Sequence, residues 1–83
     1  MRYSITVEVS LRVGIADPQG STIERALPAM GISGVSGVRA GKCFWFELDA
    51  ASPEAAEETA RQLADRLLAN PVIEDSTVRV VPA

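Results

Sequence analysis

The first segment of the chain alternates apolar and polar side chains without interruption. Apolar residues stand at every second position from Tyr3 to Val13, and polar residues stand between them from Arg2 to Arg12. Because successive side chains of a strand point to opposite faces, the pattern predicts a strand with one buried face. Such a strand reaches roughly 40 Å, whereas a compact chain of this size is roughly 30 Å across. We therefore expect it either to bend strongly or to project from its domain, and a projecting strand would have backbone groups free to pair with another chain.

The next segment carries the period of a helix. Apolar side chains between Ile23 and Met30 recur at i, i+3, i+4 and i+7, which places them on one helical face. Two starts fit the sequence. Asp17 can cap a helix that begins at Pro18, or Ser21 and Glu24 can form a capping box. The spacing by itself leaves both starts open.

A glycine-rich connection follows this helix. Pro28 removes a backbone donor and should loosen the last helical turn, and Gly31 should end it. Four of the six glycines lie within residues 31–41, so we predict a loose connection that includes a short strand at Val35–Arg39. Gly41 is either a bulge in one long bent strand or the turn of a hairpin. The bulge gives three strands in total, and the hairpin gives four.

The second half of the chain predicts a strand, a helix and a closing strand. Apolar and other side chains alternate from Cys43 to Asp49, as in a strand with one packed face. Ser52-Pro53-Glu54 is a typical helix start, and that helix should end near Asn70-Pro71. A last alternation around Val78–Val81 predicts the closing strand. The expected buried face comprises Ile5, Val7, Val9, Leu11, Phe44, Phe46, Leu63, Leu67, Val78 and Val80.

These elements predict one α+β domain over residues 1–83. Two helices should pack on one face of a mainly antiparallel sheet of three or four strands, in the order β-α-β(-β)-α-β. Cys43 and Trp45 fall on the other face of their strand, and Trp is enriched at interfaces. Chains just above about 70–80 residues have a thin stability margin that oligomerisation commonly offsets. We therefore expect a homodimer or homotetramer in which Cys43 and Trp45 contact another copy.

Composition and charge narrow the possible functions. Of the 83 residues 47% are hydrophobic and 23% are charged, and no apolar run reaches the about 18 residues of a membrane span. The net charge of −3 is opposite in sign to a surface that binds nucleic acid. No His and only one Cys are present, which removes the commonest general base and any intrachain disulfide or multi-cysteine metal cage. These features favour a cytoplasmic protein with no metal and no catalytic residues of its own.

Three sequence blocks carry a family resemblance over essentially the whole chain. They are Asp17-Pro18-Gln19-Gly20, Val38-Arg39-x-Gly41-Lys42 and the stretch from Leu67 to Asp75, and they stand in the same order and spacing as in the family. On this basis the chain resembles the PurS family, the small subunits of phosphoribosylformylglycinamidine (FGAM) synthase. Pro28 departs from the family pattern, because the family helix normally continues at that position.

The resemblance implies a subunit of purine biosynthesis without chemistry of its own. The family's enzyme is a ligase that makes FGAM from formylglycinamide ribonucleotide, ATP and glutamine. A glutaminase subunit, PurQ, releases ammonia, and a synthetase subunit, PurL, uses ATP and Mg²⁺, so no cofactor is implied for this chain. The small subunit is implied to join the two and to assist ammonia transfer. The residues expected to face these partners, where the resemblance is sharpest, are Asp17, Pro18, Gln19, Gly20, Arg39, Gly41 and Lys42.

A small-molecule-sensing module of the ACT or ferredoxin-like kind is the alternative function. It requires a hairpin at Gly41, and therefore a fourth strand, with a ligand held near the glycine-rich segment at a dimer interface. The hairpin is the structural feature on which this alternative depends.

Overall fold

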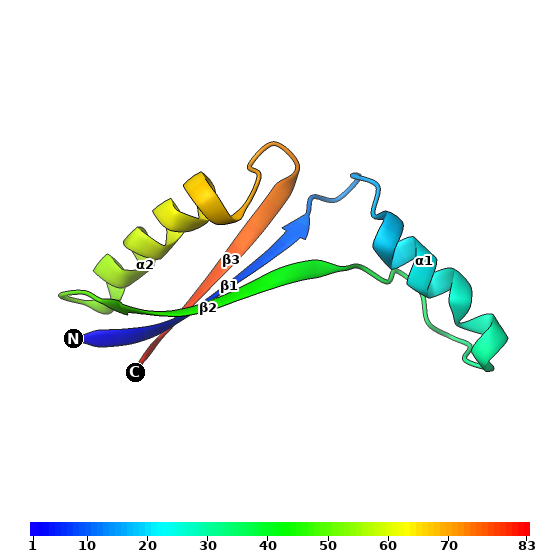
Figure 1. Ribbon diagram of the computed structural model, residues 1–83, viewed down its shortest axis with the longest axis horizontal. Coiled ribbons are helices and arrows are strands. Elements are labelled where there is room, and N and C mark those ends of the chain that lie inside the picture. The colour runs from blue at the N-terminus through cyan, green and yellow to red at the C-terminus, as the bar shows by residue number, and fades with distance from the viewer.

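The computed structural model describes all 83 residues as a three-stranded antiparallel sheet with two α-helices (Figure 1). The order β-α-β-α-β confirms the predicted α+β class, with three strands. In chain order the elements are β1 (Arg2–Leu11), α1 (Pro18–Ala26), the 3₁₀ turn η1 (Pro28–Met30), β2 (Gly41–Asp49), α2 (Pro53–Leu63), the π-helical turn η2 (Ala64–Leu68) and β3 (Glu74–Pro82).

β1 is the middle strand of the sheet. The strand order is β2-β1-β3, and both neighbours run antiparallel to β1. In this register Ile5 lies opposite Phe46 on one side and opposite Val80 on the other. Because hydrogen-bonded neighbours occupy both sides of β1, its backbone is not free to pair with another chain, and the alternative of a projecting first strand is wrong. The free edges of the sheet belong to β2 and β3.

β1 ends before its alternating pattern does. Val13 is 92% exposed, and Gly14 adopts a φ of 90° as the chain turns towards α1. β2 begins opposite Ser10 and β3 begins opposite Leu11. No partner strand therefore remains to extend the sheet beyond Leu11, although the sequence continues to alternate.

The core lies between β1 and α2. Every second residue from Tyr3 to Val9 is at most 2% exposed, which confirms the buried face of the first strand. Opposite it stand three alanines spaced by four residues, Ala56, Ala60 and Ala64, each 0% exposed. Their small side chains let the helix lie close to the sheet. The partly buried hydrophobic residues around this core include Phe44, Phe46, Leu48, Leu68, Val78 and Val80.

Leu67 lies outside the core, contrary to the prediction. Its side chain is 73% exposed, whereas Leu68 packs against the core. The cause is η2, in which the N–H of Ala69 donates to the carbonyl oxygen of Ala64, five residues back, at 2.8 Å. This wider turn rotates the chain less per residue than an α-helix does, so that Leu68 takes the inward position.

α1 begins and ends at local signals. Asp17 is the N-cap and Pro18 the first helical residue, so the first of the two predicted starts is correct. The α-helical ladder stops at Ala26, and Pro28 begins η1, in agreement with the loosened last turn expected there. Gly31 closes η1 with a left-handed φ of 75°, a conformation that glycine adopts at little cost.

α1 does not lie over the sheet. Figure 1 shows α2 above the sheet and α1 beyond the far ends of β1 and β2. We call residues 18–37, which comprise α1, η1 and most of the glycine-rich segment, the arm. Because the arm stands apart, Ile23 and Met30 on its apolar face are 44% and 68% exposed. The expectation that both helices pack on one face of the sheet holds only for α2.

The arm makes the molecule long. Its principal extents are 51 × 27 × 15 Å and its radius of gyration is 16.3 Å, whereas a compact chain of this length has a radius of about 12 Å. The part of the molecule that projects is therefore the arm, which the sequence did not predict, and not the long first strand.

Residues 35–40 do not form the predicted short strand. Gly34 and Gly37 adopt φ values of 83° and 69°, which interrupt an extended backbone. Gly41 is simply the first residue of β2, in regular register opposite Ser10, and is neither a bulge nor a hairpin turn. A Cβ at Gly41 would lie 2.6 Å from the carbonyl oxygen of Val9, so this close approach to β1 requires glycine. The hairpin on which the sensing-module alternative depends is absent.

Candidate functional site

The two loop blocks singled out in the sequence meet where the arm joins the sheet. We call this junction, residues 17–20 and 38–42, the elbow. One carboxylate oxygen of Asp17 accepts the N–H of Gly20 at 2.9 Å, and the other accepts the N–H of Ala40 at 2.9 Å. Segments 23 residues apart are thus joined through one side chain. The sequence predicted both blocks as functional loops but did not predict that they touch.

Two further contacts close the elbow. A Cβ at Gly20 would overlap the carbonyl oxygen of Val38, so the first turn of α1 passes against the entry to β2 only because this residue has no side chain. One turn later, the carboxylate of Glu24 accepts the N–H of Val38 at 2.9 Å. Glu24 therefore does not form the capping box suggested by its spacing from Ser21. A contact across fourteen residues leaves no local sequence signal.

Charge is concentrated at the elbow. The hydrogen bonds from the N–H groups of Gly20 and then Ala40 lower the pKa of the Asp17 carboxyl, and the nearby Arg39 cation adds to this effect. The guanidinium of Arg39 donates to the carbonyl oxygen of Leu11 at the end of β1. The ammonium of Lys42 lies 3.5 Å from the Glu74 carboxylate at the start of β3. The elbow is therefore tied to all three strands.

The predicted partner-facing residues divide into two groups. The side chains of Pro18, Gln19, Arg39 and Lys42 are exposed, whereas Asp17 is half-buried and Gly20 is buried. Beside the exposed group lies an open hollow of about 400 Å³, lined in part by Val9, Leu11, Pro18 and Lys42. A partner approaching the elbow would meet a turn, two cations and an apolar floor.

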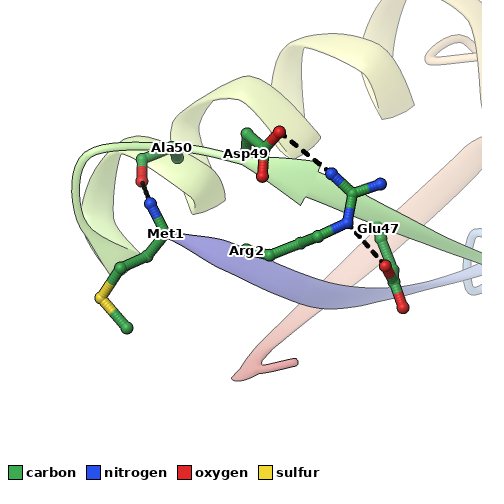
Figure 2. Close-up of polar contacts among 5 residues, drawn as sticks. All are labelled: Met1, Arg2, Glu47, Asp49 and Ala50. Carbon is green, nitrogen blue, oxygen red and sulfur yellow. Dashed lines mark hydrogen bonds and ion pairs between the residues drawn. The ribbon is translucent and has the colours of Figure 1, made fainter.

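A second polar cluster closes the opposite end of the sheet (Figure 2). Arg2 donates to Glu47 at 2.7 Å and to Asp49 at 3.0 Å. These two hydrogen bonds, that to Glu47 first, raise the pKa of the Arg2 guanidinium. The N-terminal ammonium donates to the carbonyl oxygen of Ala50 at 3.0 Å. These contacts hold the end of β2 to β1 and lie at the opposite end of the sheet from the elbow.

Cys43 and Trp45 stand on the face of the sheet that α2 leaves uncovered. Trp45 lies between Phe44 and Phe46, which pack against the core, so its side chain points to the other face. It is 74% exposed, and the free Cys43 is half-buried. The sequence-based division of β2 into two faces is confirmed, and the face opposite the core carries a large exposed aromatic ring.

No group of three or more His, Cys, Asp or Glu side chains is placed to hold a metal ion. No helix is both long enough and apolar enough to cross a membrane. The residues that the structure does bring together, at the elbow, are suited to recognition and to holding the arm.

Comparisons with known proteins match the chain along nearly its whole length. Residues 4–82 match the family model of PurS, described as phosphoribosylformylglycinamidine (FGAM) synthase. The chain is 47% identical over 72 residues to the FGAM synthase subunit PurS of Mycobacterium leprae, covering 87% of each protein. It is 35% identical over 78 residues to that of Methanocaldococcus jannaschii, covering 94% of each.

Solved structures agree with the sequence matches. The crystal structure of M. jannaschii PurS, one of the subunits of formylglycinamide ribonucleotide amidotransferase, superposes with a TM-score of 0.87 at 33% identity, covering 98% of both chains. A chain of the PurLQS structure from Thermotoga maritima gives 0.88 at 33% identity, covering 98% of this chain and 99% of that one. The fold and these matches define a small α+β subunit of a multi-subunit synthase. The chain belongs to the PurS family of FGAM synthase subunits. The sensing-module alternative receives no support.

Proposed function

We propose that this chain is the small, non-catalytic subunit of an FGAM synthase complex in the cytoplasm. In this role it joins a glutaminase subunit, PurQ, to a synthetase subunit, PurL, and assists the passage of ammonia between them. ATP and Mg²⁺ are bound by the synthetase, and this chain holds no cofactor. Near neutral pH free ammonia is diluted and mostly protonated, so a joined complex keeps the nucleophile concentrated and neutral.

The observation that carries this proposal is the match to a chain of the T. maritima PurLQS structure over nearly the full length of both chains. The shape of the molecule supports it. A subunit 51 Å long has exposed surfaces at widely separated points. The elbow lies at one end of the sheet, and its exposed side chains Pro18, Gln19, Arg39 and Lys42 are the surface that we assign to a partner subunit.

An add-back assay tests the proposal. PurQ and PurL from the same organism are combined with and without this chain, and FGAM formation is followed with glutamine or with ammonia as the nitrogen donor. We expect glutamine-dependent activity only when the chain is present, and little change in ammonia-dependent activity, because the chain couples two sites without contributing to either reaction. If the chain changes neither activity and does not co-elute with the other subunits, the proposal is wrong.

The elbow surface is tested by measuring assembly, as co-elution of the chain with PurQ and PurL at several salt concentrations. Because Lys42 lies 3.5 Å from Glu74, we use the neutral pair Arg39→Gln and Lys42→Gln to avoid bringing two carboxylates together. Loss of two exposed cations should weaken assembly by about tenfold and reduce its dependence on salt. The matched control replaces Arg61 and Arg66, two exposed cations of α2 and η2, by Gln. Equal behaviour of the two double variants would remove the elbow from the partner surface.

We further propose that the chain forms a homodimer or homotetramer through the open face of the sheet, with Trp45 and Cys43 in the contact. The large exposed ring of Trp45 supports this assignment, because aromatic side chains supply much of the binding energy at interface centres.

A further inference from the structure

The contacts of the elbow lie at the two ends of the arm, which we call its roots: residues 17–20, where the arm begins, and residues 38–40, where it leads into β2. We infer that these contacts form a clasp that sets the direction of the arm for assembly. The clasp consists of the hydrogen bonds to the Asp17 and Glu24 carboxylates and of the close contact between the backbone of Gly20 and Val38. On this inference Asp17 is a positioning residue and does not contact the partner subunit. The inference rests on the proposed function for its role in assembly, whereas the clasp itself is a property of the isolated chain.

The carboxylate of Asp17 has two separate tasks. Its bond to the N–H of Gly20 caps α1, which any good N-cap residue would provide. Its bond to the N–H of Ala40 is not needed for the helix and crosses to the segment that enters β2. Because both oxygens are engaged by backbone donors, the side chain has a single orientation, and its second bond fixes the start of α1 relative to β2.

Gly20 and Glu24 fix the next turn of the helix. The backbone of Gly20 lies directly against the carbonyl oxygen of Val38, and Glu24 accepts the N–H of the same residue. Consecutive turns of α1 thus meet Val38 at two points, by close packing against its carbonyl oxygen and by a hydrogen bond to its N–H. Two points along a helix define the direction of its axis, which a single cap would leave free to pivot.

Nothing else of comparable extent holds the arm. Figure 1 shows α1 beyond the ends of the strands, with the arm connected to the sheet only through its two roots. Four of its large apolar side chains, Ile23, Met30, Ile32 and Val35, are at least 41% exposed. The direction of the arm, and with it the 51 Å length of the molecule, therefore depends on a few hydrogen bonds.

A fixed arm matters for a subunit that joins two others. If the arm pivoted freely in solution, the conformational entropy lost when it becomes ordered would weaken binding to each partner. A clasp that is already closed removes that cost before the partners meet. The family blocks at residues 17–20 and 38–42 then have two roles. Asp17 and Gly20 make internal contacts, whereas Arg39 and Lys42 present exposed side chains.

Asp17→Asn tests the clasp without removing the helix cap, because Asn and Asp are about equally good N-caps. In the variant the side-chain oxygen can still accept the N–H of Gly20, but an NH₂ group replaces the acceptor for Ala40. Hydrogen exchange of the full-length chain, read residue by residue by NMR, should show the protection of the Ala40 amide falling by about tenfold or more. The amide of Val7 in the middle strand should be unchanged. The matched control is Asp65→Asn, an exposed carboxylate in η2.

Assembly with PurQ and PurL is then measured for the same variants. We expect Asp17→Asn to weaken assembly by about tenfold with thermal unfolding almost unaltered, and Asp65→Asn to match the unsubstituted chain. Gly20→Ala should act in the same direction, because its Cβ pushes Val38 away.

Three outcomes would contradict the inference. Wild-type protection of Ala40 in Asp17→Asn would overturn the clasp. Lost protection with unchanged assembly would overturn its positioning role. If the unsubstituted chain itself does not assemble, the proposed function fails and the positioning role fails with it, while lost protection would still identify the clasp in the isolated chain.

Discussion

Asp17 shows how one side chain acts on two scales. It is a helix N-cap by its place in the sequence and a link between segments 23 residues apart by its place in the fold. Its neighbours are equally divided in their tasks. Gly20 and Gly41 are required where two backbones approach closely, while Arg39 and Lys42 keep exposed cations at the same junction. Residues that stand together in one loop block therefore have different physical roles: the glycines allow close packing of the backbone, and the cations provide exposed charge.

The lowered pKa of Asp17 predicts how the elbow responds to acid. The folded chain holds this carboxyl deprotonated below its ordinary pKa of 3.8, so the unfolded or opened form binds the proton more readily. Its contribution to the stability of the closed elbow is complete above the ordinary pKa and is lost as the pH falls through the lower folded value. An NMR titration should show the amide shifts of Gly20 and Ala40 changing together with a midpoint below 3.8.

Asp17→Asn is the control for this titration, because it removes the titrating group, and its Gly20 and Ala40 amide shifts should not change over the same range. A midpoint at or above the ordinary value in the unsubstituted chain would mean that the two backbone bonds do not hold the carboxylate.

At the scale of elements, α2 is held to the sheet by small residues. Ala56 and Ala60 of α2, together with Ala64 at the start of η2, repeat every four residues and are fully buried in one cluster with the apolar side chains of β1. Ser52 accepts the N–H of Ala55 at 3.1 Å and starts the helix, as its Ser-Pro-Glu sequence predicts. The stripe is narrow, so the helix turns one line of methyl groups towards the sheet and leaves its acidic side chains in solvent.

Enlarging the middle of this stripe should separate the helix from the sheet. We expect Ala60→Leu to lower the free energy of unfolding by about 1–3 kcal/mol, because the added carbons overfill a packed core. Urea unfolding measures the change. Gln62→Leu, on an exposed position of the same helix, is the matched control and should stay within about 0.5 kcal/mol of the unsubstituted chain. A stable Ala60→Leu variant would show that the helix can move away from the strands at little cost.

At the scale of the whole molecule, the chain has a small core and a large open surface. Only eight of 83 residues are buried, and one face of the sheet has no helix on it (Figure 1). The exposed Trp45, which the edge strand β2 carries on that face, is costly for a chain that remains alone in water. Association of copies through this face would cover the ring and add to a thin core.

Trp45→Ser tests this association. Light scattering after size exclusion should give the unsubstituted chain as a dimer or tetramer and the variant as a single chain of 8.8 kDa at the same concentration. Leu67→Ser is the matched control, since Leu67 is 73% exposed and Trp45 is 74% exposed, and it should keep the larger mass. A single-chain mass for the unsubstituted protein would contradict the homo-oligomer, and an unchanged mass for Trp45→Ser would remove Trp45 from the contact.

Several features of this protein are local, and the sequence by itself determined them. The alternation from Tyr3 onwards identified β1 and its buried face, Asp17-Pro18 and Ser52-Pro53 marked helix starts, and Gly31 marked an end. Together with the three family blocks they were enough for the α+β class and for membership of the PurS family. Each depends on residues a few positions apart, whose geometry is dictated by backbone conformation and hydrogen bonding within one turn or one strand.

Other features were decided only by the tertiary structure. Periodicity shows that a strand has a buried face but not which strands flank it, and so the central place of β1 was missed. It shows that a helix is amphipathic but not that α1 stands beyond the sheet (Figure 1). The wider turn at η2 exchanged Leu67 for Leu68, and the bond from Ala40 to Asp17 joined two distant loops. These outcomes depend on which distant surfaces pack best together, a choice that the free energy of the whole fold makes and that no local pattern contains.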